Sequence, residues 1–181
     1  MARVGRVQTI GVAVAVPEPY GSELRRYRAS FGDPLADAVP AHVTLLPPTE
    51  IDPDRLGEIE EHLSQVAERH PSFRMHLRGT ATFRPVSPVV FVALAEGISA
   101  CEVLANDVRS GYLDRELTFP YHPHVTVAHH IDDQSLDQAF KVLADYECTF
   151  EVAAFHLYVH GEDELWRPYR AFELAAADSD E

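Results

Sequence analysis

The sequence has few cysteines, and it has no apolar run long enough to cross a membrane. Its two cysteines, Cys101 and Cys148, are too few for a disulfide scaffold and lack the spacing of a metal-binding motif, so we expect buried free thiols. A membrane helix needs roughly 20 consecutive apolar residues. These absences exclude a membrane span and favour a globular, cytoplasmic protein.

The N-terminal segment admits two interpretations. Arg3 and Arg6 precede the apolar run TIGVAVAV, and this order is also found in secretory signals. The run is short and β-branched, which is more typical of a buried strand. We therefore expect residues 7–16 to form the first strand.

Lysine is also scarce, because Lys141 is the only one, and the formal net charge is −14. Residues 1–90 carry 10 arginines against 11 acidic residues, whereas residues 91–181 carry 5 basic residues against 18 acidic ones. Non-specific binding to a duplex depends on phosphates neutralised by lysine and arginine. Long duplex nucleic acid is therefore excluded as a partner, and a small anion would be bound by arginine or protonated histidine.

The apolar pattern predicts strands alternating with helices. We expect strands at 7–16, 41–47, 72–83, 88–95, 121–130, 148–161 and 165–174. We expect helices at 22–31, 52–70, 99–112 and 133–146, with Ser22 as the cap of the first and Asp52, followed by Pro53 at the first helical position, as the cap of the second. No linker or composition shift divides the chain, so residues 1–181 are predicted to form one domain of two lobes, with a disordered acidic tail at 176–181.

One short motif, HVT, occurs twice, at His42–Thr44 and at His124–Thr126. Each copy lies in a predicted strand that is followed by an amphipathic helix and two further strands. The two series are 41–47, 53–69, 72–83 and 89–95, and 121–128, 133–146, 148–160 and 165–174. This order indicates an internal duplication that places His42 and His124 in equivalent positions across a pseudo-twofold axis.

The motif presents a histidine and a threonine together. Successive side chains of a strand point to opposite faces, so the histidine and the threonine share one face while the valine between them points into the core. Histidine can transfer protons near neutral pH, and a threonine hydroxyl can donate to an anionic oxygen. Two opposed copies could therefore perform an in-line displacement at phosphorus without a metal.

The segments HVTLLPP (42–48) and HVTVAH (124–129) resemble the two-histidine (2H) phosphoesterase superfamily, whose signature is a pair of His-x-Thr/Ser motifs flanked by hydrophobic residues. Residues 79–94 are similar to its central strand pair, and residues 169–174 to its last strand. The resemblance implies a bilobal, pseudo-twofold α+β fold of two antiparallel sheets flanked by helices. The central cleft would contain the four motif residues His42, Thr44, His124 and Thr126.

This superfamily includes bacterial 2'-5' RNA ligase-like proteins and cyclic nucleotide phosphodiesterases. The resemblance implies a metal-independent phosphoesterase without a cofactor, which hydrolyses or reversibly forms a 2',5'- or 2',3'-cyclic phosphodiester. Its partner would be a small nucleotide or an RNA end that carries a cyclic phosphate, as in RNA processing, and the protein is expected to be a monomer. The two histidines would act as acid and base, and the threonines would hold the phosphoryl oxygens.

The sequence departs from this pattern at one position. Many RNA ligase-like members have an arginine three residues after the second threonine, where this chain has His129. His129 when protonated, or Arg84, is a candidate replacement. Tyr121 and His122 are further candidates for substrate binding, although Tyr121 also fits aromatic core packing and His122 also fits a polar strand end.

Two other classes of function stay open. A metal-dependent hydrolase would use the histidine cluster at 122–130, with His122 and His124 on one strand face and a third ligand elsewhere. That alternative leaves the matching motif at 42–44 unexplained. A non-catalytic module that binds a nucleotide or an RNA end is the other alternative, and turnover distinguishes it from an enzyme.

Overall fold

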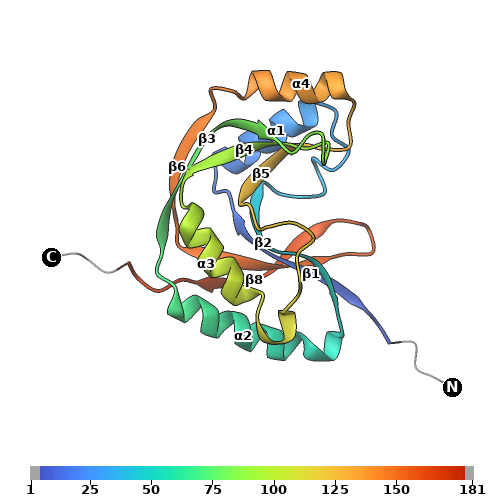
Figure 1. The fold of residues 1–181 in the computed structure, drawn as a ribbon. Helices are drawn as coiled ribbons and strands as arrows, with labels where there is room; N and C mark the ends of the chain where they lie inside the picture. Colours follow the sequence, from blue (N-terminus) through green and yellow to red (C-terminus); the bar gives the residue numbers. More distant parts are fainter. Residues whose placement is uncertain (1–4, 178–181) are drawn as a thin grey trace.

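The computed structural model describes residues 5–177, which form two four-stranded antiparallel sheets (Figure 1). The first sheet has the order β2 (His42–Ile51), β1 (Gln8–Ala15), β7 (Ala154–His160) and β8 (Trp166–Glu173). The second has the order β5 (His124–Ala128), β4 (Val90–Glu96), β3 (Phe73–Thr82) and β6 (Glu147–Val152). The predicted α+β class with two antiparallel sheets is confirmed.

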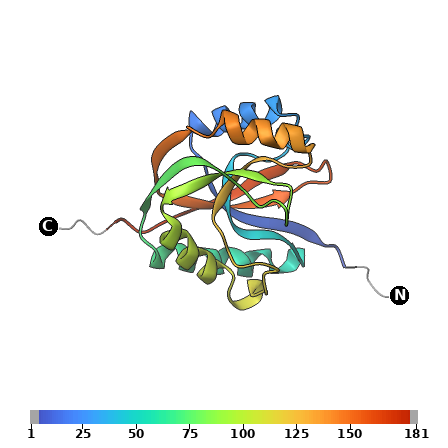
Figure 2. The same cartoon turned by 45° about the horizontal axis from the view of Figure 1, so that its top comes forward.

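Four α-helices flank the sheets in two pairs. They are α1 (Tyr20–Ser30), α2 (Leu56–Arg69), α3 (Ile98–Val108) and α4 (Asp133–Val142), with short 3₁₀ helices at Pro53–Arg55 and Gly111–Leu113. Helices α2 and α3 pack against the first sheet, and α1 and α4 against the second. Figure 2 shows these pairs on opposite sides of the molecule.

Helices α1 and α3 cross from one sheet to the other. Helix α1 follows β1 of the first sheet but contacts β5 of the second, and α3 follows β4 of the second sheet but contacts β2 of the first. Through this exchange, each sheet packs against a helix that follows a strand of the other sheet. It also brings α1 beside the strand that carries the second HVT motif.

The duplication is visible in the sheets, but its units differ from the predicted ones. The series β1, α1, β2 matches β4, α3, β5, and each series ends on an HVT strand at a sheet edge. The prediction that 89–95 corresponds to 165–174 was wrong, because β4 pairs with the HVT strand as β1 does. The order of elements along a chain does not specify which strands pair.

Two predicted strands differ from the observed ones. The strand predicted at 148–161 is interrupted at Ala153, where the chain leaves the second sheet as β6 and enters the first as β7. The strand predicted to stop at Pro47 continues as β2 to Ile51. Prolines cannot donate to a ladder, but β2 is an edge strand, and its pairing with β1 is irregular opposite these residues.

Of the two predicted helix caps, the structure contains one. Asp52 caps the 3₁₀ turn before α2, because its carboxylate accepts a hydrogen bond from the Asp54 N–H at 2.9 Å, as predicted. Ser22 is not a cap: α1 begins two residues earlier, and the Ser22 hydroxyl donates to Glu18 Oε1 at 2.8 Å.

Both cysteines are buried and free, which confirms the prediction, and burial raises the pKa of the Cys101 thiol to about 12. Between residues 5 and 177, no helix combines the length and the apolar character that a membrane crossing demands. Of the predicted acidic tail, residues 178–181 lie outside the described residues.

Candidate active site

The two HVT motifs adopt the same arrangement on their strands. Val43 and Val125 are fully buried, whereas the histidine and threonine on either side of each valine are partly exposed on the opposite face. The alternation follows from the two-residue period of a strand. The predicted pairing of histidine and threonine on one face is therefore present in both copies.

The two motif histidines make equivalent hydrogen bonds. The Nδ1–H of His42 donates to the carbonyl oxygen of Pro40 at 2.6 Å, and the Nδ1–H of His124 donates to the carbonyl oxygen of His122 at 2.7 Å. A carbonyl oxygen only accepts, so each bond fixes the proton on Nδ1 in the neutral ring. The Nε2 atom of each ring is then left as the basic nitrogen.

Burial lowers the pKa of both histidines below its ordinary value, because the charged ring loses solvation. The bonded backbone carbonyls oppose this change, and nearby positive charge adds to it. For His42 that charge is the Arg28 guanidinium, and for His124 it comes from the His122 and His42 rings. The charge of His42 is thus among the causes that lower the pKa of His124.

A cavity of about 390 Å³ lies between the first sheet and the end of β5. His42 and Thr44 of the first motif line it, together with Thr126 of the second motif and His129 just beyond it. Its remaining lining residues, apart from Arg28, are apolar or aromatic, namely Gly11, Val12, Ala13, Leu35, Val39, Pro40, Leu46, Pro48, Tyr158 and Trp166. Four of the predicted site residues therefore share one cavity.

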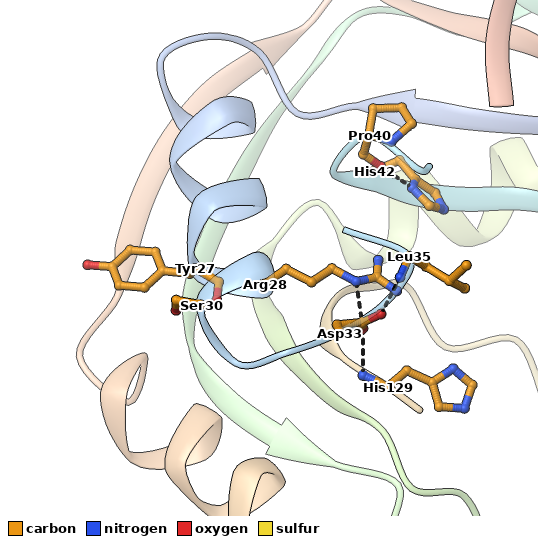
Figure 3. A network of polar contacts seen from close by, with 8 residues as sticks. All are labelled: Tyr27, Arg28, Ser30, Asp33, Leu35, Pro40, His42 and His129. Atoms are coloured by element: carbon orange, nitrogen blue, oxygen red, sulfur yellow. Dashed lines mark hydrogen bonds and ion pairs between the residues drawn. The ribbon is translucent and has the colours of Figure 1, made fainter. Parts of the chain in front are cut away.

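The cavity also contains a residue that the sequence interpretation missed, Arg28 of α1. Its guanidinium Nε donates to Asp33 Oδ2 at 2.8 Å, and the same oxygen accepts the backbone N–H of His129 at 2.8 Å (Figure 3). The other oxygen of Asp33 accepts the Leu35 N–H at 2.9 Å. This buried ion pair connects α1 to the segment after β5, which holds His129.

His124 is not among the residues that line this cavity. It lies against Phe83 and Phe91, with ring centroids 4.9 and 5.1 Å away. His122 is exposed, and its ring lies 6.3 Å from that of His124 and at a steep angle to the same two phenylalanines. Substrate binding by His122 stays a prediction.

Tyr121 and Arg84 also lie outside the lining of the cavity. The Tyr121 hydroxyl donates to the backbone carbonyl of Thr44 at 2.7 Å and so connects the segment before β5 to β2. Arg84 pairs with Asp137 of α4 at 2.9 Å. Their roles in substrate binding likewise stay predictions.

The metal-hydrolase alternative requires a third ligand beside His122 and His124. Within residues 5–177, no three or more histidine, cysteine, aspartate or glutamate side chains are grouped so that they could hold a metal ion. The imidazole nitrogen Nδ1 of His124 is already bonded to a backbone carbonyl. The described residues thus do not provide the ligand set that this alternative needs.

Comparison with known proteins identifies the family. Residues 16–164 match the model of the 2'-5' RNA ligase superfamily, and the chain belongs to this family. A "putative phosphoesterase" of Bacillus cytotoxicus is 27% identical over 144 residues, which cover 78% of this chain and 83% of the relative. Another of Oceanobacillus iheyensis is 25% identical over 166 residues, covering 91% and 96%.

Solved structures give the same fold. The apo structure of E. coli LigT matches with a TM-score of 0.68 at 20% identity, over 94% of this chain and 99% of that one. The structure of the same E. coli protein complexed with 3'-AMP matches with a TM-score of 0.64 at 18% identity. The resemblance to the two-histidine phosphoesterases is confirmed by the family match, and the solved structures show that the chain has the fold of E. coli LigT.

Proposed function

We propose that this protein is a metal-independent phosphoesterase that opens a 2',3'-cyclic phosphate on a nucleotide or at an RNA end. The observation that carries the proposal is the equivalent Nδ1 hydrogen bond of His42 and His124. It leaves Nε2 as the basic nitrogen of both histidines, one from each HVT motif. Two such groups are what an in-line displacement needs, one to remove a proton and the other to supply one.

In hydrolysis, the Nε2 atom of one histidine takes a proton from water while the water oxygen forms a bond to phosphorus. The bond from phosphorus to one ribose oxygen breaks, and the Nε2–H of the other histidine protonates that leaving oxygen. The proton count balances, because one ring gains the proton that the other loses. With the 5'-hydroxyl of a second ribose in place of water and the 3' oxygen as the leaving group, the same forward steps form a 2',5' linkage.

The threonines have a separate role in this scheme. The side chains of Thr44 and Thr126 line the cavity from opposite sheets. Each hydroxyl can donate a hydrogen bond to a non-bridging phosphoryl oxygen, where negative charge develops during the reaction. Fixed donors are more effective than water at this position because they need no reorientation.

The relatives support a nucleotide as the substrate. Crystal structures of E. coli LigT have been solved in complex with 3'-AMP, with ATP and with phosphate. The curated relatives in the Bacillus group are named as phosphoesterases. A cavity of about 390 Å³ with an apolar wall suits one nucleoside better than a long strand.

Turnover of the four nucleoside 2',3'-cyclic phosphates in excess EDTA tests this proposal. His42→Asn and His124→Asn are the informative variants, because the asparagine amide can still donate to the carbonyl that Nδ1 contacts while Nε2 is lost. Each is expected to lower kcat by about 10²-fold to 10⁴-fold, the range of general acid–base catalysis. His76→Asn is the matched control, since His76 contacts Glu147 on the second sheet and not the cavity.

The outcomes separate the classes of function. Chelator-resistant turnover that both motif variants lose, and that His76→Asn keeps, supports the paired histidines. Turnover that EDTA abolishes would support a metal-dependent hydrolase instead. No turnover of these substrates or of larger RNA ends, with or without divalent metal, would leave a non-catalytic binding module.

A further inference from the structure

Arg28 is a buried cation whose hydrogen-bonding capacity is only partly used. Its exposed fraction is 7%, and its one hydrogen bond among the described residues runs from Nε to Asp33. The two Nη groups, which carry four N–H donors, have no protein partner in residues 5–177. The Nη atoms are not fully buried. Among the described residues, the fully buried side-chain polar atoms without a partner belong to Arg109, Tyr146 and His156, and none belongs to Arg28.

These free donors belong to a residue that lines the cavity of the candidate active site. Among the described residues that line the cavity, Arg28 alone carries a full charge at neutral pH. Burial lowers the pKa of the two histidine rings there, His42 and His129, which favours their neutral forms. Asp33 offsets part of the Arg28 charge, but the unused Nη donors still favour an anion at this wall of the cavity.

The guanidinium is also held in a fixed orientation. Asp33 accepts from Arg28, from the His129 N–H and from the Leu35 N–H, so the carboxylate is positioned by two backbone groups as well as by the ion pair. Figure 3 shows the chain of contacts from α1 through Asp33 to His129. An arginine fixed through Nε presents both Nη groups as a planar fork, which matches two oxygens of one phosphate.

We propose that Arg28, oriented by Asp33, forms an oxyanion subsite that binds two non-bridging oxygens of a nucleotide phosphate. The assignment of that phosphate to the group that reacts between His42 and His124 rests on the proposed function. A second phosphate on the same ligand has the same chemistry and could also reach the fork. In both cases the group that Arg28 binds is a phosphate oxyanion.

Equilibrium binding of inorganic phosphate, measured by calorimetry, tests the subsite without any turnover. The test variant is Arg28→Gln with Asp33→Asn, which removes the buried charges together so that neither is left unpaired. The matched control is Arg26→Gln with Asp37→Asn, which makes the same chemical changes at exposed positions. The phosphate dissociation constant should rise about tenfold to a hundredfold in the first variant and stay unchanged in the second.

Three ligands identify the source of the phosphate. Adenosine should bind both double variants and the wild type equally. If adenosine 3'-monophosphate loses as much affinity in the Arg28 variant as adenosine 3',5'-bisphosphate does, then Arg28 binds the reacting phosphate. If only the bisphosphate loses affinity, then Arg28 binds a second phosphate. Both results support an oxyanion subsite.

Equal phosphate affinity in the two double variants, with both folded by circular dichroism, would overturn the subsite. This failure differs from failure of the proposed function. A wild-type protein that binds phosphate through Arg28 yet hydrolyses no cyclic phosphate keeps the subsite and loses the function. A wild-type protein that hydrolyses cyclic phosphates, with phosphate affinity independent of Arg28, does the reverse.

Discussion

His42 and His124 each donate Nδ1–H to the carbonyl oxygen two residues earlier in the chain, at 2.6 and 2.7 Å. The two strands belong to different sheets, so the bond is reproduced by local geometry and not by a shared neighbour. In both cases the bond selects the same tautomer and holds the ring. This is the tautomer that the proposed exchange of protons through Nε2 requires.

The pH dependence of catalysis follows from the lowered pKa of both histidines. The reactive form has one ring neutral and the other protonated, and its population is greatest between the two pKa values. Both values lie below the ordinary 6.5. We expect kcat/KM, which reports the free enzyme, to peak below pH 6.5 and to fall toward pH 8. A profile of kcat/KM that still rises at pH 8 would contradict this.

The same shifts affect stability. A histidine whose pKa is lower in the folded state than in the unfolded chain binds fewer protons when folded, so the free energy of unfolding falls as the pH drops through 6.5 and below. Asparagine does not titrate. The loss of stability between pH 7 and pH 5 should therefore be smaller in His42→Asn than in the wild type. Urea denaturation at both pH values measures it, and equal losses would be the contrary result.

The buried pair of Arg28 and Asp33 should be sensitive to loss of one partner. Arg28→Met leaves the Asp33 carboxylate buried without its cation, which we expect to cost about 3–5 kcal/mol of stability. Removing both charges with Arg28→Gln and Asp33→Asn should recover much of this loss. Glu58→Gln, in an exposed pair with Arg55, is the control and should change stability little. Equal effects of the single and double changes would refute the coupling.

Tyr121 should contribute to the connection between the two motif strands. Tyr121→Phe removes the hydroxyl that donates to the Thr44 carbonyl and should lower the free energy of unfolding by about 1 kcal/mol. Tyr112→Phe, at an exposed ring, is the matched control. A Tyr121 variant as stable as its control in urea would show that this bond contributes nothing net.

Much of the fold could be predicted because local patterns specify local structure. Alternation located most strands, and the sequence of Asp52 and Pro53 located the start of the helical segment that becomes α2. The pairing of strands within the sheets could not be predicted in this way. The separation of β6 from β7 at Ala153 depends on which sheet each strand joins, and no local pattern carries that information.

Only some residues of the candidate site could be predicted, for the same reason. The motif residues were found because the HVT unit is repeated, whereas Arg28 lies in a segment with two other arginines that resembles an exposed helix. One signal was present. Leu24 and Arg28 are four residues apart and therefore share a helix face, and both are buried. A charged residue on the apolar face of a helix indicates a buried partner of opposite charge.

The central claim is that His42 and His124 act as one acid–base pair, and a double-mutant cycle tests it most directly. We would measure kcat/KM for a nucleoside 2',3'-cyclic phosphate with His42→Asn, His124→Asn and the double variant. Residues that act as a unit are strongly non-additive, so the double variant should be about as slow as the slower single variant. Losses that multiply in the double variant, or a single variant with wild-type activity, would contradict the account.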